Sequence, residues 1–270
     1  WTSDAFGKSV ATSTLGVGLD YNEDLMTRIA DAGGGRYHFI ESGDQVPEVL
    51  GDEFAGLTGT VARNVTLSVD PTAGIELGTI PGYPNTVDGD AVMAKVGSLS
   101  AGRMRELLVR MDYQPVQGDT MALGTYTLRF RDVLSEGKPM EIVLEPTVAV
   151  TQDPAAMEAS ENYAVTVRAQ EIDVAAALQR ASEQADSGNF DEARKQLQGK
   201  TEALRKEAAE NPDVNYSPML DDLEQAEQDL EGAESSLIEL QRYKKSNKAK
   251  AYKRSKAYKP SMKKPLKKSK

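Results

Sequence analysis

The chain has 270 residues, of which 39% are hydrophobic, and a formal net charge of -10. It contains no cysteine and one histidine, His38, which excludes disulfides, zinc-thiolate sites, thiol nucleophiles and metal sites built from several histidines. No apolar run approaches the roughly 20 residues that a membrane-spanning helix needs. The first residue is Trp1 and not Met, so we expect a fragment or a processed product, and the sequence leaves the compartment unknown.

The net charge conceals two regions of opposite sign. Residues 241–270 contain 14 Lys and Arg and no acidic residue, which leaves 18 basic against 42 acidic residues in the first 240, a net charge of -24. Because the two regions attract different partners, their charges have to be considered separately. The sequence predicts an acidic body that carries a basic tail.

The first 62 residues have the pattern of alternating strands and helices. Residues 12–17 read as a buried strand, Asn22 can cap a helix, and three glycines at 33–35 end that helix before a second strand at 36–40. An amphipathic helix is expected over 44–62, with an apolar stripe of Val46, Val49, Leu50, Phe54 and Leu57. This order predicts a parallel sheet covered by helices. Two strands are too few for such a sheet, so further strands are expected upstream or from another chain.

Residues 63–170 change to a period of two. Val65, Leu67 and Val69 alternate with polar residues, and turn-rich stretches separate further candidate strands near 74–80, 91–98, 103–113, 122–131, 140–150 and 160–170. Several strands at short spacing without helices between them indicate an antiparallel β-sandwich.

From residue 171 the period is helical again. Helices are expected over about 171–186, 191–210 and 217–245, joined by short links that favour antiparallel packing. The first two helices resemble a single tetratricopeptide-like hairpin, with the pattern Leu178, Ala181, Ala185, Gly188, Phe190, Ala193 and Leu197. The third carries a stripe for packing or for self-association through the helices, formed by Leu220, Leu223, Leu230, Leu237 and Leu240. Residues 246–270 lack apolar residues to bury and are expected to be a disordered, Lys-rich tail.

The ordered series in residues 13–25 and 29–40 reads STLGVGLDYNEDL and IADAGGGRYHFI. It resembles the last third of a von Willebrand factor A (VWA) domain in bacterial proteins, where a strand ending in Gly-x-Gly precedes Asn-Glu-x-Leu, an alanine-rich helix, Gly-Gly-x-Tyr and a buried strand. The similarity covers about residues 10–62, and the later regions look more diffusely like the tail that such proteins carry.

The resemblance implies a Rossmann-like sheet and metal-dependent protein binding. The family holds Mg²⁺ through an Asp-x-Ser-x-Ser loop, a distant Thr and a distant Asp, and the metal takes a carboxylate from the partner. A hard cation with oxygen ligands and one open position suits that role. This sequence contains no Asp-x-Ser-x-Ser, so we expect no metal or other cofactor in this chain and Mg²⁺ only in a complete VWA domain. The resemblance slightly favours an extracytoplasmic or cell-surface location.

Two places near the first strands are candidate sites. Asp20, Tyr21 and Asn22 follow the carboxyl end of a parallel strand, where such folds bind ligands, although the same residues also suit a simple capped turn. His38 is expected to be half-buried or exposed and not catalytic, because no nucleophile lies in a recognisable elbow. The three glycines precede a strand and not a helix, which is the wrong order for a phosphate loop.

The basic tail is a candidate polyanion-binding element. Lysines attract polyanions by counterion release, and tyrosines among them can stack on bases. The candidate residues are Lys250, Tyr252, Lys253, Arg254, Lys256, Tyr258 and Lys259. Nucleic acid, acidic glycans, anionic lipid headgroups and the protein's own acidic body all fit this chemistry, as does a merely solubilising tail.

Together these patterns predict an α+β multidomain protein. The expected parts are the end of a Rossmann-like VWA domain at 1–62, a β-sandwich at 63–170, a helical region at 171–245 and a basic tail at 246–270. The expected function is non-enzymatic protein–protein interaction or scaffolding with an unknown protein partner. The alternatives are a polyanion-binding surface protein that acts through its tail, and the non-catalytic end of a larger hydrolase.

Overall fold

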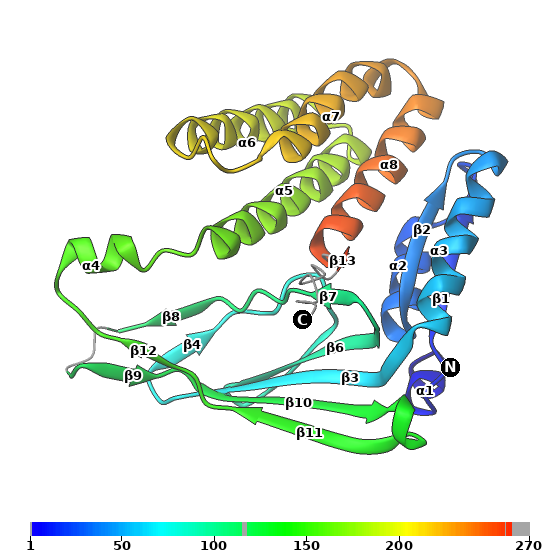
Figure 1. The fold of residues 1–270 in the computed structure, drawn as a ribbon. Helices are drawn as coiled ribbons and strands as arrows, with labels where there is room; N and C mark the ends of the chain where they lie inside the picture. Colours follow the sequence, from blue (N-terminus) through cyan, green and yellow to red (C-terminus); the bar gives the residue numbers. More distant parts are fainter. Residues whose placement is uncertain (1, 115–117, 257, 261–270) are drawn as a thin grey trace, which may run out of the picture.

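The computed structural model describes residues 2–114, 118–256 and 258–260. Its first part is a small α/β unit, in which β1 and β2 pair in parallel and place Leu15 beside His38. Figure 1 shows α2 and α3 alongside these two strands. The elements of this unit are α1 (Thr2–Gly7), β1 (Thr12–Val17), α2 (Glu23–Ala32), β2 (Gly34–Ile40), the short helix η1 (Gly43–Gln45) and α3 (Val46–Thr58).

The local signals in this unit act as expected. Asn22 caps α2, and its side chain accepts a hydrogen bond of 2.8 Å from the backbone N–H of Leu25. Gly33 ends the helix, and Gly34 has a φ of +64°, where a Cβ would come within 2.5 Å of the Phe6 ring. Glycine is therefore required both for the left-handed backbone and for the close approach of α1. The predicted helix stop is confirmed.

A five-stranded antiparallel sheet, the main sheet, follows directly on α3 and has the order β11-β10-β3-β6-β5. Its buried residues include Val65, Val69, Val92 and Ala94, and Ile80 and Tyr83 from the segment after β4 pack onto them. The strands of this region are β3 (Thr60–Pro71), β4 (Ile75–Leu77), β5 (Asn85–Asp88), β6 (Ala91–Ser100), β7 (Arg103–Arg105), β8 (Met111–Tyr113), β9 (Thr120–Ala122), β10 (Gly124–Asp132), β11 (Lys138–Leu144) and β12 (Thr147–Ala149), with the short helix η2 (Val133–Ser135).

The β region is antiparallel as predicted, but its strands differ in detail. The expected strand at 103–113 is divided into β7 and β8, and β4 pairs with β8 as a separate ribbon beside the main sheet. The strand expected at 160–170 is wrong, because α5 begins there at Tyr163. Val165, Thr166 and Val167 favour a strand, but Asn162 caps a helix by accepting from the N–H of Ala164, and the helix packs Val167 against a core. Tertiary packing outweighs this weak local preference.

Helices follow the β region: α4 (Pro154–Ala159), α5 (Tyr163–Asp186), α6 (Phe190–Glu210), α7 (Ser217–Ser235) and α8 (Leu237–Lys256). The last four pack together around a core that includes Leu178, Leu197, Leu204, Leu223 and Leu230. Figure 1 shows α8 descending between this bundle and the α/β unit, toward the main sheet.

The predicted disorder from residue 246 is wrong for residues 246–256, which belong to α8. The short strand β13 (Tyr258–Pro260) then pairs with β7, and residues 261–270 lie outside the described residues. The expected helix 217–245 is two helices, because Ser236 accepts a bond from the N–H of Glu239 and starts α8. Leu237 therefore leaves the predicted leucine stripe and is 82% exposed at the turn, whereas Leu223 and Leu230 are fully buried.

Candidate functional site

The loop after β1 is the first half of the candidate site. Tyr21 folds back over β1, where a Cβ on Gly16 would come within 2.1 Å of its ring, and its hydroxyl shares a 2.8 Å hydrogen bond with that of Tyr37 on β2. Burial raises the pKa of both phenols. Asp20 is exposed, while Asn22 is used as the helix cap. The loop therefore presents an ordered backbone and aromatic ring at the carboxyl end of the parallel strand.

Helix α8 supplies the second half through Lys245. This side chain is fully buried, and its ammonium donates to the carbonyl of Tyr21 at 2.6 Å and to the carboxylate of Glu23 at 2.8 Å. The same ammonium lies 4.0 Å from the centre of the Tyr21 ring, within the range of a cation–π contact. Lys248, one turn later, reaches Glu23 at 3.2 Å and Asp24 at 2.8 Å. Two lysines thus hold the start of α2.

These contacts set the protonation of the acid between them. Burial would raise the pKa of Glu23, but the hydrogen bond from Lys245 and the charge of Lys248 outweigh it and lower the pKa to about 2. Burial would also lower the pKa of Lys248, and the neighbouring carboxylates of Asp24 and Glu23 raise it instead. Glu23 is therefore ionised at neutral pH, and Lys248 keeps its positive charge beside it.

The other end of α2 has a matching contact. Asp31 accepts from the Tyr252 hydroxyl at 3.1 Å and pairs with the Lys256 ammonium at 2.8 Å. Lys256 is buried and also lies over the rings of Tyr83, at 4.7 Å, and Tyr252, at 5.1 Å. Burial lowers the pKa of Lys256, opposed by the charge of Asp31. The hydroxyl of Tyr83 donates to the Lys256 carbonyl, which joins the main sheet to the same point.

The opposite side of α8 pairs with acids of the bundle. Arg254 donates to Asp222 of α7 at 2.7 Å, and Lys250 lies 3.7 Å from the same carboxylate. Lys244 pairs with Asp186 of α5. In the α/β unit, Arg242 reaches Glu41, directly after β2. We call this set the α8 brace: the cations of α8 with their acids Glu23, Asp24, Asp31, Glu41, Asp186 and Asp222. It links the α/β unit to the bundle across a single helix.

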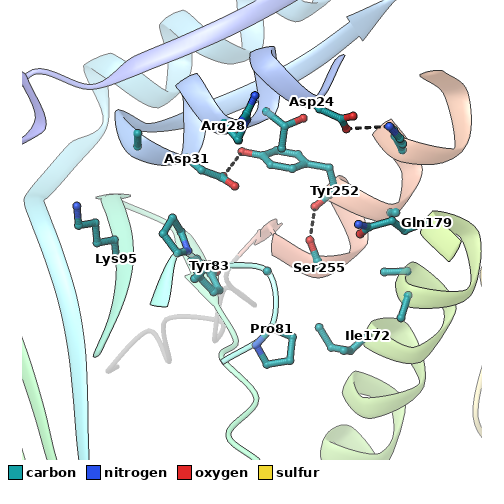
Figure 2. A pocket seen from close by; sticks show the side chains of 18 residues that line it. Asp24, Arg28, Asp31, Pro81, Tyr83, Lys95, Ile172, Gln179, Tyr252 and Ser255 are labelled. Atoms are coloured by element: carbon teal, nitrogen blue, oxygen red, sulfur yellow. Dashed lines mark hydrogen bonds and ion pairs between the residues drawn. The ribbon is translucent and has the colours of Figure 1, made fainter. Parts of the chain in front are cut away.

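A cleft of about 620 Å³ lies beside the brace, between α2, the turn at 81–84, α5 and α8. Figure 2 shows Asp31 bonded to Tyr252 on one wall and Ile172 and Gln179 on another. Its volume is in the range of small-molecule sites. Its acids Asp24 and Asp31 are already paired with α8, so the walls offer no free carboxylate for acid–base chemistry.

His38 belongs to a separate cluster that fastens α3 to the strands. Its Nε2 lies 2.8 Å from a carboxylate oxygen of Glu53. The same carboxylate forms an ion pair with Arg36 at 2.7 Å and accepts a hydrogen bond from the Ser13 hydroxyl at 2.7 Å. Burial would raise the pKa of Glu53, but the hydrogen bond from His38 and its other partners lower it. The histidine is half-buried, as expected. Because Ser13 donates to the glutamate and not to the histidine, the geometry is not that of a nucleophile–base pair.

The structure brings the candidate loop to α8, the helix that carries most of the basic candidate set. Tyr21 of the loop contacts α8, four residues of the basic candidate set pair with acids or tyrosines inside the chain, and Lys253 is exposed without an ion pair among the described residues. The four are Lys250, Tyr252, Arg254 and Lys256. Tyr258 and Lys259 lie in β13. The paired cations of this set contact acids of the protein's own body. Binding of any other polyanion stays a prediction.

Sequence reasoning missed Lys245, Glu23 and Asp31 as a connected set. A local signal did exist for the start of α8: Ser236-x-x-Glu239 is a capping-box pattern. The excess of basic residues after 241 and of acidic residues before it was visible as well. No local pattern shows which acid meets which lysine, since Glu23 and Lys245 are separated by 222 residues.

Comparison with known proteins places the fold. No family model matches the chain. A stretch of 62 residues, 23% of this chain and 11% of the other protein, is 40% identical to the uncharacterized protein YfbK of Escherichia coli (strain K12). A solved von Willebrand factor type A protein from Catenulispora acidiphila covers 84% of this chain with a TM-score of 0.58 and 18% identity. The ArnB paralog VWA2 from Sulfolobus acidocaldarius gives a TM-score of 0.43, at 19% identity over 88% of this chain.

The resemblance to VWA-domain proteins is therefore confirmed at the level of the fold. The chain spans about half the length of the solved structures, 53% and 55%, and a small part of the curated relative. Within the residues that the structure describes, no group of three His, Asp or Glu side chains is placed to hold a metal ion. Glu23 and Glu41, which follow the two parallel strands, are each engaged by cations of α8. These residues do not fit the Mg²⁺ site that the fold family implies.

None of the described helices combines the length and the apolar character that a membrane-spanning segment needs.

Proposed function

We propose that this chain, which has the fold of VWA-domain proteins, is a non-enzymatic scaffold for protein–protein interaction. The α8 brace is the observation that carries the proposal. One helix holds acids of α2 on one side and acids of α5 and α7 on the other. Such a brace keeps three differently built surfaces in a constant arrangement, and surfaces fixed in advance lose less entropy when a protein partner binds.

The chemistry of the described residues also supports a binding role over a catalytic one. The buried acids and bases at α8 are paired with each other, as in a structural ion-pair network. The cluster of Ser13, His38 and Glu53 ties α3 to the strands. An accessible group with an unsatisfied proton donor or acceptor would be needed for acid–base catalysis, and these clusters do not supply one.

The test compares partner binding by the intact protein with partner binding by a variant whose α8 brace is opened. The double substitution Lys245→Glu and Lys248→Glu places like charges against Glu23 and Asp24 and should open the brace. Wild-type protein and this variant are used as bait with extract of the source cell, and each retained protein is purified and titrated by calorimetry. A partner that binds wild type and loses about tenfold or more in affinity for the variant supports the proposal. Lys253→Glu, on the exposed face of the same helix, is the matched control.

The enzyme alternative is tested on the same preparation. Turnover of ester, phosphoester, glycoside or peptide substrates that disappears with a single substitution at Ser13, His38 or Glu53 would contradict the scaffold. Binding of an oligonucleotide or heparin that depends on Lys253 and weakens with salt would favour the polyanion alternative instead.

A further inference from the structure

The turn between α7 and α8 is unusually short. α7 ends at Ser235 and α8 begins at Leu237, so Ser236 alone reverses the chain, with an extended backbone at φ -145° and ψ 126°. The helices are antiparallel, because Arg254 near the end of α8 contacts Pro218 and Asp222 at the start of α7. Antiparallel helices are ordinarily joined by two to five residues or so. A connection this short is a tight hinge, and such hinges favour domain exchange.

The residues at this hinge include no helix breaker. Residues 233–240 contain neither Gly nor Pro, so they can continue a helix. The turn is held by Ser236, whose hydroxyl accepts a long 3.4 Å bond from the N–H of Glu239. If Ser236 becomes helical, α7 and α8 form one continuous helix over residues 217–256. That straight form loses one weak cap and gains a turn of helix.

Two apolar residues at the hinge are exposed in the closed form. Leu237 is 82% exposed and Ile238 is 63% exposed. Figure 1 shows this turn at the end of the bundle that lies away from the main sheet, where a second molecule has access. Two straightened helices that cross at this point would bury the four side chains against each other, which is favourable for apolar surface.

The contacts of α8 can be made equally well between chains. Its ion pairs reach acids on other elements, such as Lys245 with Glu23, Lys256 with Asp31 and Arg254 with Asp222. Its buried face also includes the Tyr243 hydroxyl and the Asn247 amide, which have no hydrogen-bond partner in the described part of the chain. Unsatisfied buried polar groups weaken the packing of α8 in its own bundle and ease its departure.

We propose that two copies of this chain exchange α8 and β13, with each α8 completing the brace of the other copy. Among the described residues, the exchanged dimer keeps the ion pairs that α8 makes in the monomer and differs from the monomer at the Ser236 hinge. The interaction surface is thus the acidic start of α2 with the facing sides of α5 and α7, and its occupant is α8 of a second copy. The proposal is independent of the proposed scaffold function.

The absence of cysteine allows a direct test. An Asp24→Cys chain and a Lys248→Cys chain are mixed, unfolded, refolded together at high concentration and treated with a short bismaleimide. Asp24 and Lys248 lie 2.8 Å apart at their charged ends, so exchange places the two thiols, on different chains, within reach. A covalent two-chain product on a denaturing gel is expected. The matched control replaces Lys248→Cys by Lys206→Cys, on the exposed face of α6, and should give none.

Hinge variants are compared by light scattering after size-exclusion chromatography. Ser236→Ala removes the cap and should raise the dimer fraction several-fold, whereas three glycines inserted after Ser236 relax the turn and should lower it about tenfold. Circular dichroism checks that both variants keep their helices. A wild-type chain that stays monomeric after concentrated refolding overturns the proposal, and so does a dimer that gives no cross-chain product or is unchanged by the glycine insertion.

Discussion

Helices α3 and α8 differ in composition and in burial, and in both helices the burial is the reverse of what hydrophobicity predicts. α3 carries Leu50, Phe54 and Leu57, which are 39%, 63% and 58% exposed, and has no buried residue. α8 is rich in lysine, yet Lys244, Lys245, Asn247 and Lys256 are buried in it. Hydrophobicity alone would place the two helices the other way round. Burial in this molecule therefore follows the availability of partners, because acids from α2, α5, α7 and the loop after β2 surround α8, whereas only the polar side of α3 is engaged.

The largest expected effect tests whether the buried lysines of α8 hold it in place. Lys245→Ala should lower the free energy of unfolding by about 3 kcal/mol, because Glu23 stays buried and loses one of its two lysine partners. Lys253→Ala, on the exposed face of the same helix, should change it by less than about 0.5 kcal/mol. Urea unfolding followed by circular dichroism measures both. Equal losses for the two variants would mean that burial of the lysine is irrelevant to stability.

Acid should weaken the same contact in a defined range. The pKa of Glu23 is about 2 in the folded protein, against an ordinary value of 4.5, so its contribution is complete above about pH 5 and is lost as the pH falls from about 4.5 toward 2. The shift corresponds to about 3 kcal/mol, which solvent screening reduces to about 1–2 kcal/mol.

Glu23→Gln is the matched variant for this prediction. The difference in unfolding free energy between wild type and Glu23→Gln should be largest at neutral pH and should close between pH 4.5 and 2 as Glu23 becomes protonated. Parallel pH profiles for the two proteins would show that Glu23 does not carry this acid sensitivity.

A smaller effect concerns the cap that positions Glu23. Asn22→Ala removes the acceptor for the N–H of Leu25 and should cost about 1 kcal/mol. Asn22→Asp keeps an acceptor at the same place and should remain near wild type, because aspartate also caps helices well. Thermal unfolding distinguishes the two. If both variants lose the same stability, the amide of Asn22 acts through something other than the cap.

The comparison also explains what the sequence could predict. Asn22, Gly33 and the strands around it follow from short-range chemistry, so the α2 cap and its stop were predictable. The alternation of Val65, Leu67 and Val69 likewise predicted β3. Residues 246–256 were misassigned because their order depends on acids far along the chain: Asp31 for Lys256 and Asp222 for Arg254. A basic stretch alone looks solvated, and only its partners make it a buried helix.

The same dependence on distant partners decides which site residues could be found from the sequence. Tyr21 was a predicted candidate and Lys245 was not, and the fold brings the Lys245 ammonium to 4.0 Å from the centre of the Tyr21 ring. The loop residues were found by their place after a parallel strand, which is a rule of topology. Lys245 was within reach of the charge analysis but not of any spacing rule, because its partners are a backbone carbonyl and an acid on α2.

The smallest expected effect on stability comes from α3, the apolar helix of the comparison. Phe54→Ser and Leu57→Ser should each change the free energy of unfolding by less than about 0.5 kcal/mol, because these side chains are exposed already. Glu53→Gln, one position away, should cost more, since Glu53 receives Ser13, Arg36 and His38. The two kinds of variant therefore separate the apolar side of α3 from its polar attachment. Urea unfolding of the three proteins decides the order. A large loss for Phe54→Ser would show that this side chain is covered in solution, and dynamic light scattering at several concentrations would then show whether a second copy covers it.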